Sequence, residues 1–237
     1  MEFIAKCRKL WDALFFKGNG DGYMRVVTGL KNTVIIAVAG LLIGIVIGTL
    51  IALIRVVPKR HKALKALEKI ASVYVAFFRG TPMVAQLLLG YYVLLPLMGV
   101  KLSSLAVCVL IFGLNSGAYV SEIMRSGLLS VDIGQTEAGR ALGLSFGQTM
   151  LRIVVPQAVK NILPTLGNEF ITLIKETSIV SFVGAVDLYA AFNYIGSANY
   201  EYMVPYLAMA LIYIVLVLAI SGLIKLMERR LRAGDKH

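Results

Sequence analysis

Long uncharged stretches alternate along the chain with short charged ones. Residues 32–54, 80–100, 102–121 and 203–223 contain no Asp, Glu, Lys or Arg. Each is close to the roughly 20 residues that an α-helix needs to cross about 30 Å of hydrocarbon. A helix in a soluble core rarely stays uncharged for so long. The pattern therefore predicts an all-α, polytopic membrane protein.

Basic residues gather at the ends of the uncharged stretches and predict the topology. Residues 55–69 carry six Lys or Arg against one acid, and residues 225–232 form a second basic cluster. Because positively charged loops stay in the cytoplasm, five spans place the N-terminus outside and the C-terminus inside. Six spans would remove the conflict posed by the basic N-terminal segment. They would, however, place residues 55–69 or the arginine-bearing linker 125–152 outside.

The remaining spans are less regular. Residues 102–124 and 156–174 predict spans, and residues 179–196 predict a short re-entrant or surface helix. Residues 70–98 allow two short spans or one span broken at residues 79–82, and we favour the break because Pro82 lacks an N–H group and Gly80 adds freedom. Non-helical backbone at membrane depth is tolerated only against protein or water, so the break indicates a cavity.

Small residues recur every four positions in the first span. Gly40, Gly44, Gly48 and Ala52 therefore lie along one stripe of the helix. Small residues at this spacing let a second helix approach closely in lipid. The stripe predicts a close helix–helix contact.

The N-terminal segment predicts a helix of another kind. In residues 1–17 the apolar side chains share a face and the charged ones occupy the rest, which is typical of an interfacial helix lying on a membrane. The sequence GNGDGY then breaks the helix. We therefore expect an interfacial helix at residues 1–18 and one transmembrane domain at 19–237. The apolar face consists of Phe3, Ile4, Leu10, Trp11, Leu14 and Phe15.

Composition narrows the function. The net charge is +11, and the basic residues border the hydrophobic runs. They lack the interleaved aromatic residues of a nucleic-acid-binding surface. We therefore expect lipid, and no nucleic acid, as the partner of these residues. Cys7 and Cys108 are far apart, and His61 and His237 have no ligand cluster around them. We expect neither a disulfide framework nor a metal site.

Residues 126–155 form the predicted cytoplasmic linker, which reads as two short helices. Thr136 or Asp132 can cap the first and Gly143 stops it; Ser145 can cap the second, which we expect to end at Pro156. The apolar side chains of this corner have nothing obvious to bury against, so they indicate a partner protein. They are Ala138, Ala141, Leu142, Leu144, Phe146 and Met150.

The same segment carries a family resemblance. EAGRALGLSFGQTMLRIVVPQA, residues 137–158, resembles the EAA loop of binding-protein-dependent ABC importer permeases. FFRGTPMVAQLL, NSGAYVSEIMRSGLLSVDIGQTEAGRALG and LIKETSIVSFVG are similar to polar amino-acid permeases of such importers. The loop matches at Glu137, Ala138, Gly143, Ile153 and Pro156, with Gly139 and Val155 standing where Ala and Leu are usual.

The resemblance implies a type I ABC importer permease fold with a coupling loop at residues 126–156. The loop would seat in a cleft on a separate ATPase, through Glu137, Ala138, Arg140, Ala141, Leu142, Gly143 and Phe146. No G-x-x-x-x-G-K-[ST] sequence occurs, so we expect no enzyme activity in this chain and ATP with Mg²⁺ on the partner. The other expected partners are a second, identical permease chain in a homodimer and an extracytoplasmic amino-acid-binding protein, at a bacterial or archaeal plasma membrane.

Other classes remain open. A channel or proton-coupled carrier could use Arg79, Glu122 and Glu169 as an intramembrane relay. The cytoplasmic two-helix corner argues against it, having no role there. A membrane enzyme would need a nucleophile–base pair or a metal cluster, and neither is visible in the sequence.

Polar residues inside the predicted spans give the candidate substrate site. Asn115, Tyr119 and Glu122 share one helical face. Arg79 could orient a substrate carboxylate or simply snorkel to the interface, and Glu122 could bind the ligand or simply pair with Arg125. Two acids on one cavity would favour arginine, lysine or histidine over glutamine or glutamate. The remaining candidates are Thr81, Gln86, Asn168 and Glu169.

Overall fold

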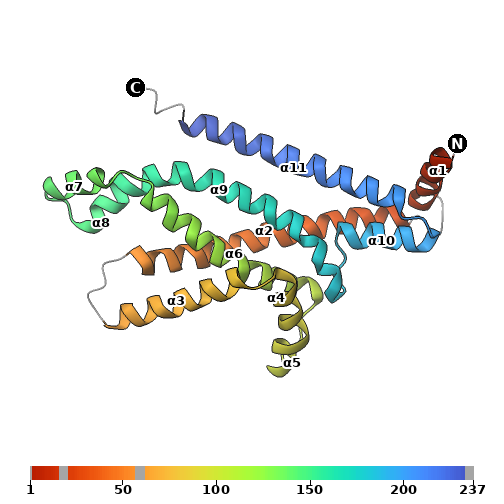
Figure 1. The fold of residues 1–237 in the computed structure, drawn as a ribbon, viewed down its shortest axis with the longest axis horizontal. Helices are drawn as coiled ribbons and strands as arrows, with labels where there is room; N and C mark the ends of the chain where they lie inside the picture. Colours follow the sequence, from red (N-terminus) through yellow and green to blue (C-terminus); the bar gives the residue numbers. More distant parts are fainter. Residues whose placement is uncertain (1, 16–20, 57–61, 233–237) are drawn as a thin grey trace.

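The computed structural model describes residues 2–15, 21–56 and 62–232. Residues 18–20 of the expected breaker, residues 57–61 of the basic stretch, and His237 lie outside these ranges. Figure 1 shows the helical elements in order. They are α1 (Glu2–Phe15), α2 (Asp21–Val56), α3 (Lys62–Gly80), α4 (Met83–Leu89), the π-helix η1 (Gly90–Leu94), α5 (Leu95–Leu97), α6 (Ser104–Leu129), α7 (Ile133–Ala141), α8 (Phe146–Thr149), the π-helix η2 (Met150–Val154), α9 (Val155–Glu176), the 3₁₀-helix η3 (Thr177–Val183), α10 (Leu188–Asn199) and α11 (Met203–Arg232).

The expected all-α membrane fold is confirmed. Three of the described helices are long and apolar enough to cross a membrane: α2, α6 and α11. Two bent pairs bring the number to five: α3 with α4–α5, at 109°, and residues 146–183 with α10, at 53°. The first bend lies at the predicted break.

Two of the predicted helices were too short. The helix α2 begins at Asp21 rather than near residue 32, and α6 continues to Leu129 rather than ending near 124. A run of uncharged residues marks only the part of a helix that lies in hydrocarbon, whereas backbone hydrogen bonds continue beyond it. The first residues of the predicted linker therefore belong to α6.

The prediction that Pro156 ends the second linker helix was wrong. Helical structure is continuous from Phe146 to Glu176, and Pro156 lies in the first turn of α9, directly after η2. The N–H of Val155 bonds the carbonyl of Met150, five residues back. The same arrangement recurs before Pro96, where the N–H of Leu95 donates to the carbonyl of Gly90. A π-turn accommodates an extra residue, so the helix passes a proline without breaking.

The stripe of small residues on α2 packs against α6, as predicted. A Cβ atom on Gly44 would lie 2.6 Å from Ser116 Oγ, and one on Gly48 would lie 2.6 Å from Val120 Cγ1. The contact is reciprocal, because Gly113 and Gly117 of α6 meet Ile43 and Ile47 of α2 in the same way. Two backbones at this distance hold α2 and α6 as one unit.

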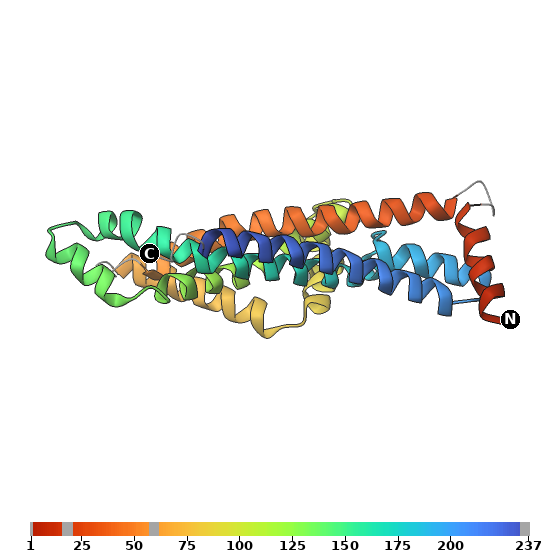
Figure 2. The ribbon, with the colours of Figure 1, turned by 90° about the horizontal axis from the view of Figure 1, so that it is seen from above.

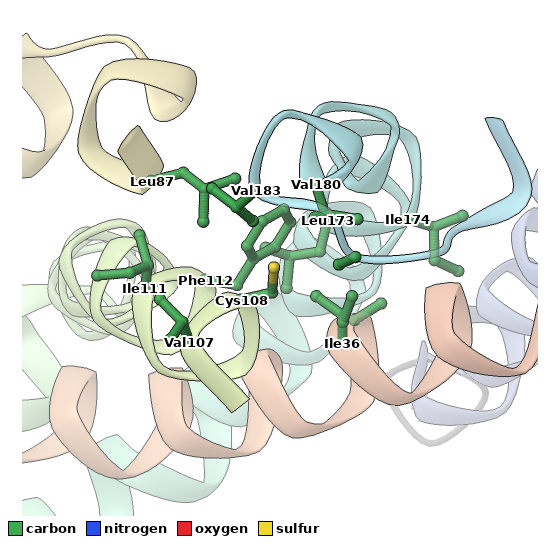
Figure 3. Packing of buried hydrophobic residues seen from close by; sticks show 12 residues of the cluster. Ile36, Leu87, Val107, Cys108, Ile111, Phe112, Leu173, Ile174, Val180 and Val183 are labelled. Atoms are coloured by element: carbon green, nitrogen blue, oxygen red, sulfur yellow. The ribbon is translucent and has the colours of Figure 1, made fainter. Parts of the chain in front are cut away.

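The main hydrophobic core joins this pair to the bent segments. Figure 3 shows Phe112 of α6 among side chains of α2, α4, α9 and η3. Ile36, Leu87, Cys108 and Phe112 are all fully buried. The core therefore positions the break near α4 against the central helix α6.

The two ends of the bundle carry different elements. In Figures 1 and 2 the linker helices α7 and α8 lie at one end with the last turns of α11, whereas α1 lies across the other end. Helix α11 is peripheral, since no residue of its most apolar 18-residue window is buried.

Candidate functional site

The break between α3 and α4 is held by two buried amide side chains. Nε2 of Gln86 donates to the carbonyls of Phe78 and Thr81, at 2.8 and 3.1 Å, and to Thr81 Oγ1 at 2.9 Å. Nδ2 of Asn115, on α6, donates to Gln86 Oε1 at 2.8 Å and to the Phe78 carbonyl at 3.4 Å. The last carbonyls of a helix lack partners within it. Gln86, Asn115 and Thr81 therefore satisfy the open end of α3.

A pocket of about 320 Å³ lies beside this break, between α3, α6 and α9. Three of the predicted residues, Arg79, Tyr119 and Glu122, line it together. Thr81, Gln86, Asn115, Asn168 and Glu169 are not among its lining residues. The walls are completed by Ile123, Ser126, Gly127, Ser130, Asn161 and Thr165.

Arg79 stands at the edge of this pocket. Its guanidinium lies 5.5 Å from the ring centroid of Tyr119, and both side chains are exposed. A cation over an aromatic face at this distance is attracted by the ring, by about 0.5–1 kcal/mol at an exposed site. Tyr119 therefore holds the Arg79 cation at the pocket.

Glu122 is held between two arginines. Its Oε1 accepts from Arg55 Nη1 of α2, and its Oε2 accepts from Arg125 Nε at 2.9 Å and Nη2 at 2.8 Å. Arg55 also donates to Ser72 Oγ of α3 at 3.3 Å. The pairing with Arg125 that the sequence offered as an alternative is present. Together these contacts connect the C-terminal end of α2 with the middle of α3 and the C-terminal part of α6.

The two candidate residues on α9 point in different directions. Glu169 is 9% exposed, and its Oε1 accepts a hydrogen bond of 3.0 Å from Ser116 Oγ. Asn168 is exposed on another side of the helix. The two predicted acids, Glu122 and Glu169, therefore do not line this pocket together.

Sequence reasoning missed Asn161 and Thr165, which bring α9 to the pocket. Asn161 Nδ2 donates to Ser130 Oγ of α6 at 2.8 Å. Residues 161, 165, 168 and 172 are all Asn or Thr, and their spacing of four, three and four puts them on one helical side. This polar stripe in a membrane helix was the available signal. It places Asn168 on the same side of α9 as the pocket wall.

The linker has the predicted construction of two capped helices. Asp132, not Thr136, caps α7 by accepting from the Gly134 N–H, and Ser145 caps α8 in a capping box with Gln148. Gly143 between them has φ +82 with nothing within 4 Å of an added Cβ. A side chain at this position would therefore meet no other atom of the described chain. A left-handed backbone conformation, which favours glycine, explains the residue instead.

The corner of the linker is exposed and apolar. Leu142 is 82% exposed, and the neighbouring predicted coupling residues Glu137, Ala138, Arg140 and Ala141 are also exposed. Phe146 turns inward and lines a groove of about 470 Å³ with Ile133, Val56 and others. Gly139 is buried, and a Cβ there would lie only 2.7 Å from Thr149 Cγ2. This contact explains why glycine stands where alanine is usual.

Known proteins are similar to this chain in sequence and in architecture. The family model described as binding-protein-dependent transport system inner membrane component matches residues 44–233. An arginine transport system permease protein of Bacillus subtilis is 39% identical over 210 residues, covering 89% of this chain and 94% of the relative. A protein of Rickettsia bellii named for a glutamine transport system permease is 39% identical over 206 residues, covering 87% and 92%. The crystal structure of an amino acid ABC transporter with histidines matches with a TM-score of 0.81 at 40% identity, covering 88% of this chain and 94% of that one.

Proposed function

The chain belongs to the binding-protein-dependent transport system inner membrane component family, and we propose that it is the membrane-spanning permease of an ABC importer for polar amino acids. It is a multi-pass membrane protein of that family. Relatives that it matches over nearly their whole length are named for arginine and glutamine transport. The matching crystal structure is of an amino acid ABC transporter.

One structural relationship carries the proposed mechanism. The second linker helix is continuous with α9, and α9 supplies Asn161 and Thr165 to the pocket wall. A rigid helix moves as a body, whereas a flexible connection would absorb displacement. Movement imposed on the exposed corner at Leu142 would therefore reach the pocket directly. A separate ATPase that closes on this corner could open and close the pathway in this way.

The partners follow from the same arrangement. An ATPase dimer carrying ATP and Mg²⁺ would bind the exposed corner of the linker, on the cytoplasmic side. The opposite end, with α1 and the N-terminus, would then lie outside, facing an amino-acid-binding protein. The peripheral helix α11, which leaves Leu211, Val215 and Leu218 exposed, needs lipid or a second chain to cover it. A homodimer around one pathway would supply the second chain.

The substrate proposed is a basic amino acid. Arg79 would bind the carboxylate that all amino acids share. Arg55 and Arg125 offset the charge of Glu122. Glu169, although outside the pocket that Arg79 lines, is therefore the better candidate for a cationic side chain, since its carboxylate accepts a hydrogen bond from the neutral Ser116 hydroxyl. Glutamine or glutamate is the alternative, because the arginine and glutamine relatives are equally similar in sequence.

Reconstitution tests the function and the substrate together. The permease would be placed in proteoliposomes with a partner ATPase and binding protein, and uptake of labelled arginine and glutamine measured with and without ATP. ATP-dependent uptake that is lost when the linker corner is altered supports the proposal. Uptake that needs no ATPase would instead support a carrier. Uptake of glutamine alone would retain the importer and reject the basic substrate.

A further inference from the structure

Helix α1 crosses the end of the bundle opposite the linker. In Figure 2 its axis runs across those of α2 and α11. Ala13 is buried, and Leu10 and Leu14 are partly buried, in one cluster with Phe192 and Ile195 of α10. Lys6 forms ion pairs with Glu2, at 3.2 Å, and with Glu201 at the α10–α11 turn, at 3.5 Å. One side of α1 is therefore fixed to the protein.

A second side of α1 is apolar and uncovered. Ile4, Trp11 and Phe15 are 72%, 58% and 44% exposed, and their spacing of seven and four residues places them on one helical side. The rings of Trp11 and Phe15 lie 4.6 Å apart, and Phe15 stacks with Tyr23 of α2 at 6.0 Å. The apolar side of α1 thus continues onto the first span. Within the described residues, no segment of this chain covers it.

The third side of α1 is polar. Lys9 and Asp12 lie on it beside the small Ala5, again by spacing of four and three residues. At about 100° per residue, the bundle-facing, apolar and polar sides lie about a third of a turn apart. A helix with three such sides fits a corner where protein, hydrocarbon and water meet. A helix lying alone on a membrane surface would need only two, one apolar and one polar.

Four tyrosines indicate where α1 lies relative to the membrane surface. Tyr206 lies 6.2 Å from Tyr189 and 5.6 Å from Tyr202, ring centre to ring centre, and Tyr200 is 93% exposed. All four belong to α10, the start of α11 or the turn between them, which α1 contacts. Tyrosine and tryptophan gather where a membrane meets water, because their rings are apolar and their tips polar. Helix α1 therefore lies at the level of an aromatic belt.

We propose that the Ile4–Trp11–Phe15 side of α1 binds the phospholipid surface of the leaflet opposite the linker. Arg8, which is exposed between the apolar and polar sides, would meet lipid phosphate there. The helix would lie with its apolar side at the boundary of headgroups and acyl chains and Lys9 in water. Through Lys6 and Glu201 it would hold the outer ends of α2, α10 and α11 together. This inference concerns the membrane and is independent of the transported substrate.

The chain's single tryptophan makes the test direct. The purified permease complex would be placed in nanodiscs whose lipids carry bromine, which quenches tryptophan on contact, at a shallow or a deep acyl position. Subtracting the emission of the Trp11→Phe complex isolates Trp11. We expect strong quenching by shallow bromine and weaker quenching by deep bromine. Absence of quenching at both depths would mean that water or another protein covers this side, and would overturn the proposal.

Relocated tryptophans provide the matched comparison. In the Trp11→Phe background, Ile4→Trp should be quenched like Trp11, whereas Lys9→Trp, on the polar side, should escape quenching. Both positions are exposed, so neither substitution disturbs the core. Equal quenching at the two positions would show that α1 has no preferred lipid side and would reject the assignment. In the measurement on Trp11 itself, the only substituted protein is the Trp11→Phe reference.

Discussion

Asn115 of α6 donates a hydrogen bond of 2.8 Å to Gln86 of α4, and both side chains are buried. The pair closes the open end of α3, since each amide also reaches the carbonyl of Phe78. A bend of 109° follows at this point. The two residues thus stabilise the break. The last turn of α3, directly before the break, carries Arg79 to the pocket.

Breaking this pair should destabilise the bend. Gln86→Leu or Asn115→Leu leaves buried carbonyls without a donor, which costs about 1–3 kcal/mol. The double variant should cost less than the sum, because both side chains act in one network. Unfolding of the permease in mixed micelles measures the effect. Gln157→Leu, which removes exposed hydrogen bonds, is the control and should change little. Additive losses in the double variant would contradict the coupling.

Arg79 should be needed for uptake but not for assembly. Arg79→Ala removes the one cation among the described residues that line the pocket, so the KM for uptake should rise at unchanged amounts of complex. Tyr119→Phe keeps the ring below the guanidinium and should transport normally, whereas Tyr119→Leu loses about 0.5–1 kcal/mol of attraction. Uptake kinetics in proteoliposomes measure both. Labelling of an Arg79→Cys variant by a lipid-soluble reagent alone would place this residue outside the pathway.

Glu122 and Glu169 should respond differently to loss of charge. Glu122→Gln leaves Arg55 and Arg125 without their shared carboxylate, so arginine and glutamine binding should fall together, with about 1.5–3 kcal/mol of stability lost. Glu169→Gln keeps an acceptor for Ser116 and should weaken arginine binding selectively. Binding to the purified permease complex, without the binding protein, separates the two. A selective loss of arginine binding in Glu122→Gln would return Glu122 to the substrate site.

The linker corner should tolerate only residues that accept a left-handed backbone. Gly143→Ala should cost about 1–2 kcal/mol locally, and Gly143→Asp should uncouple ATP hydrolysis from uptake while the permease still inserts. Gly143→Asn should be milder than Gly143→Asp, because both residues visit this conformation but asparagine adds no charge to the apolar corner. Gly147→Ala is the control, with equally open space and no positive φ. Normal coupling in Gly143→Asp would remove the corner from the mechanism.

The α2–α6 contact should depend on its glycines. Gly44→Ala places a Cβ 2.6 Å from Ser116 Oγ, and overpacking of this kind costs about 1–3 kcal/mol. The hydrogen bond that Ser116 Oγ donates to Glu169 should weaken as well. Gly222→Ala on α11, where nothing lies within 4 Å, should be neutral or slightly stabilising. Equal unfolding midpoints for the two variants would argue against a close α2–α6 crossing.

The sequence alone determined the features that depend on local chemistry. Uncharged runs marked the membrane-spanning helices α2, α6 and α11, because hydrocarbon excludes charge over a known length. Gly80 and Pro82 located the break, and Ser145 and Gly143 gave the construction of the linker, since caps and turns are set by a few neighbouring residues. The stripe from Gly40 to Ala52 showed that a helix must approach closely, though not which one.

Only the tertiary structure decided which distant groups meet. The sequence offered Arg125 as a partner for Glu122 but not Arg55, which is far away in sequence. Gln86 and Asn115 were predicted substrate-site residues, whereas in the structure they donate to the open carbonyls of α3. Pro156 looked like a helix end because a π-turn leaves no clear mark in the sequence. Asn161 and Thr165 reach the pocket only because α9 crosses α6 at Ser130. A side chain's partners depend on helix crossings that long-range packing sets, whereas its local backbone depends on its neighbours.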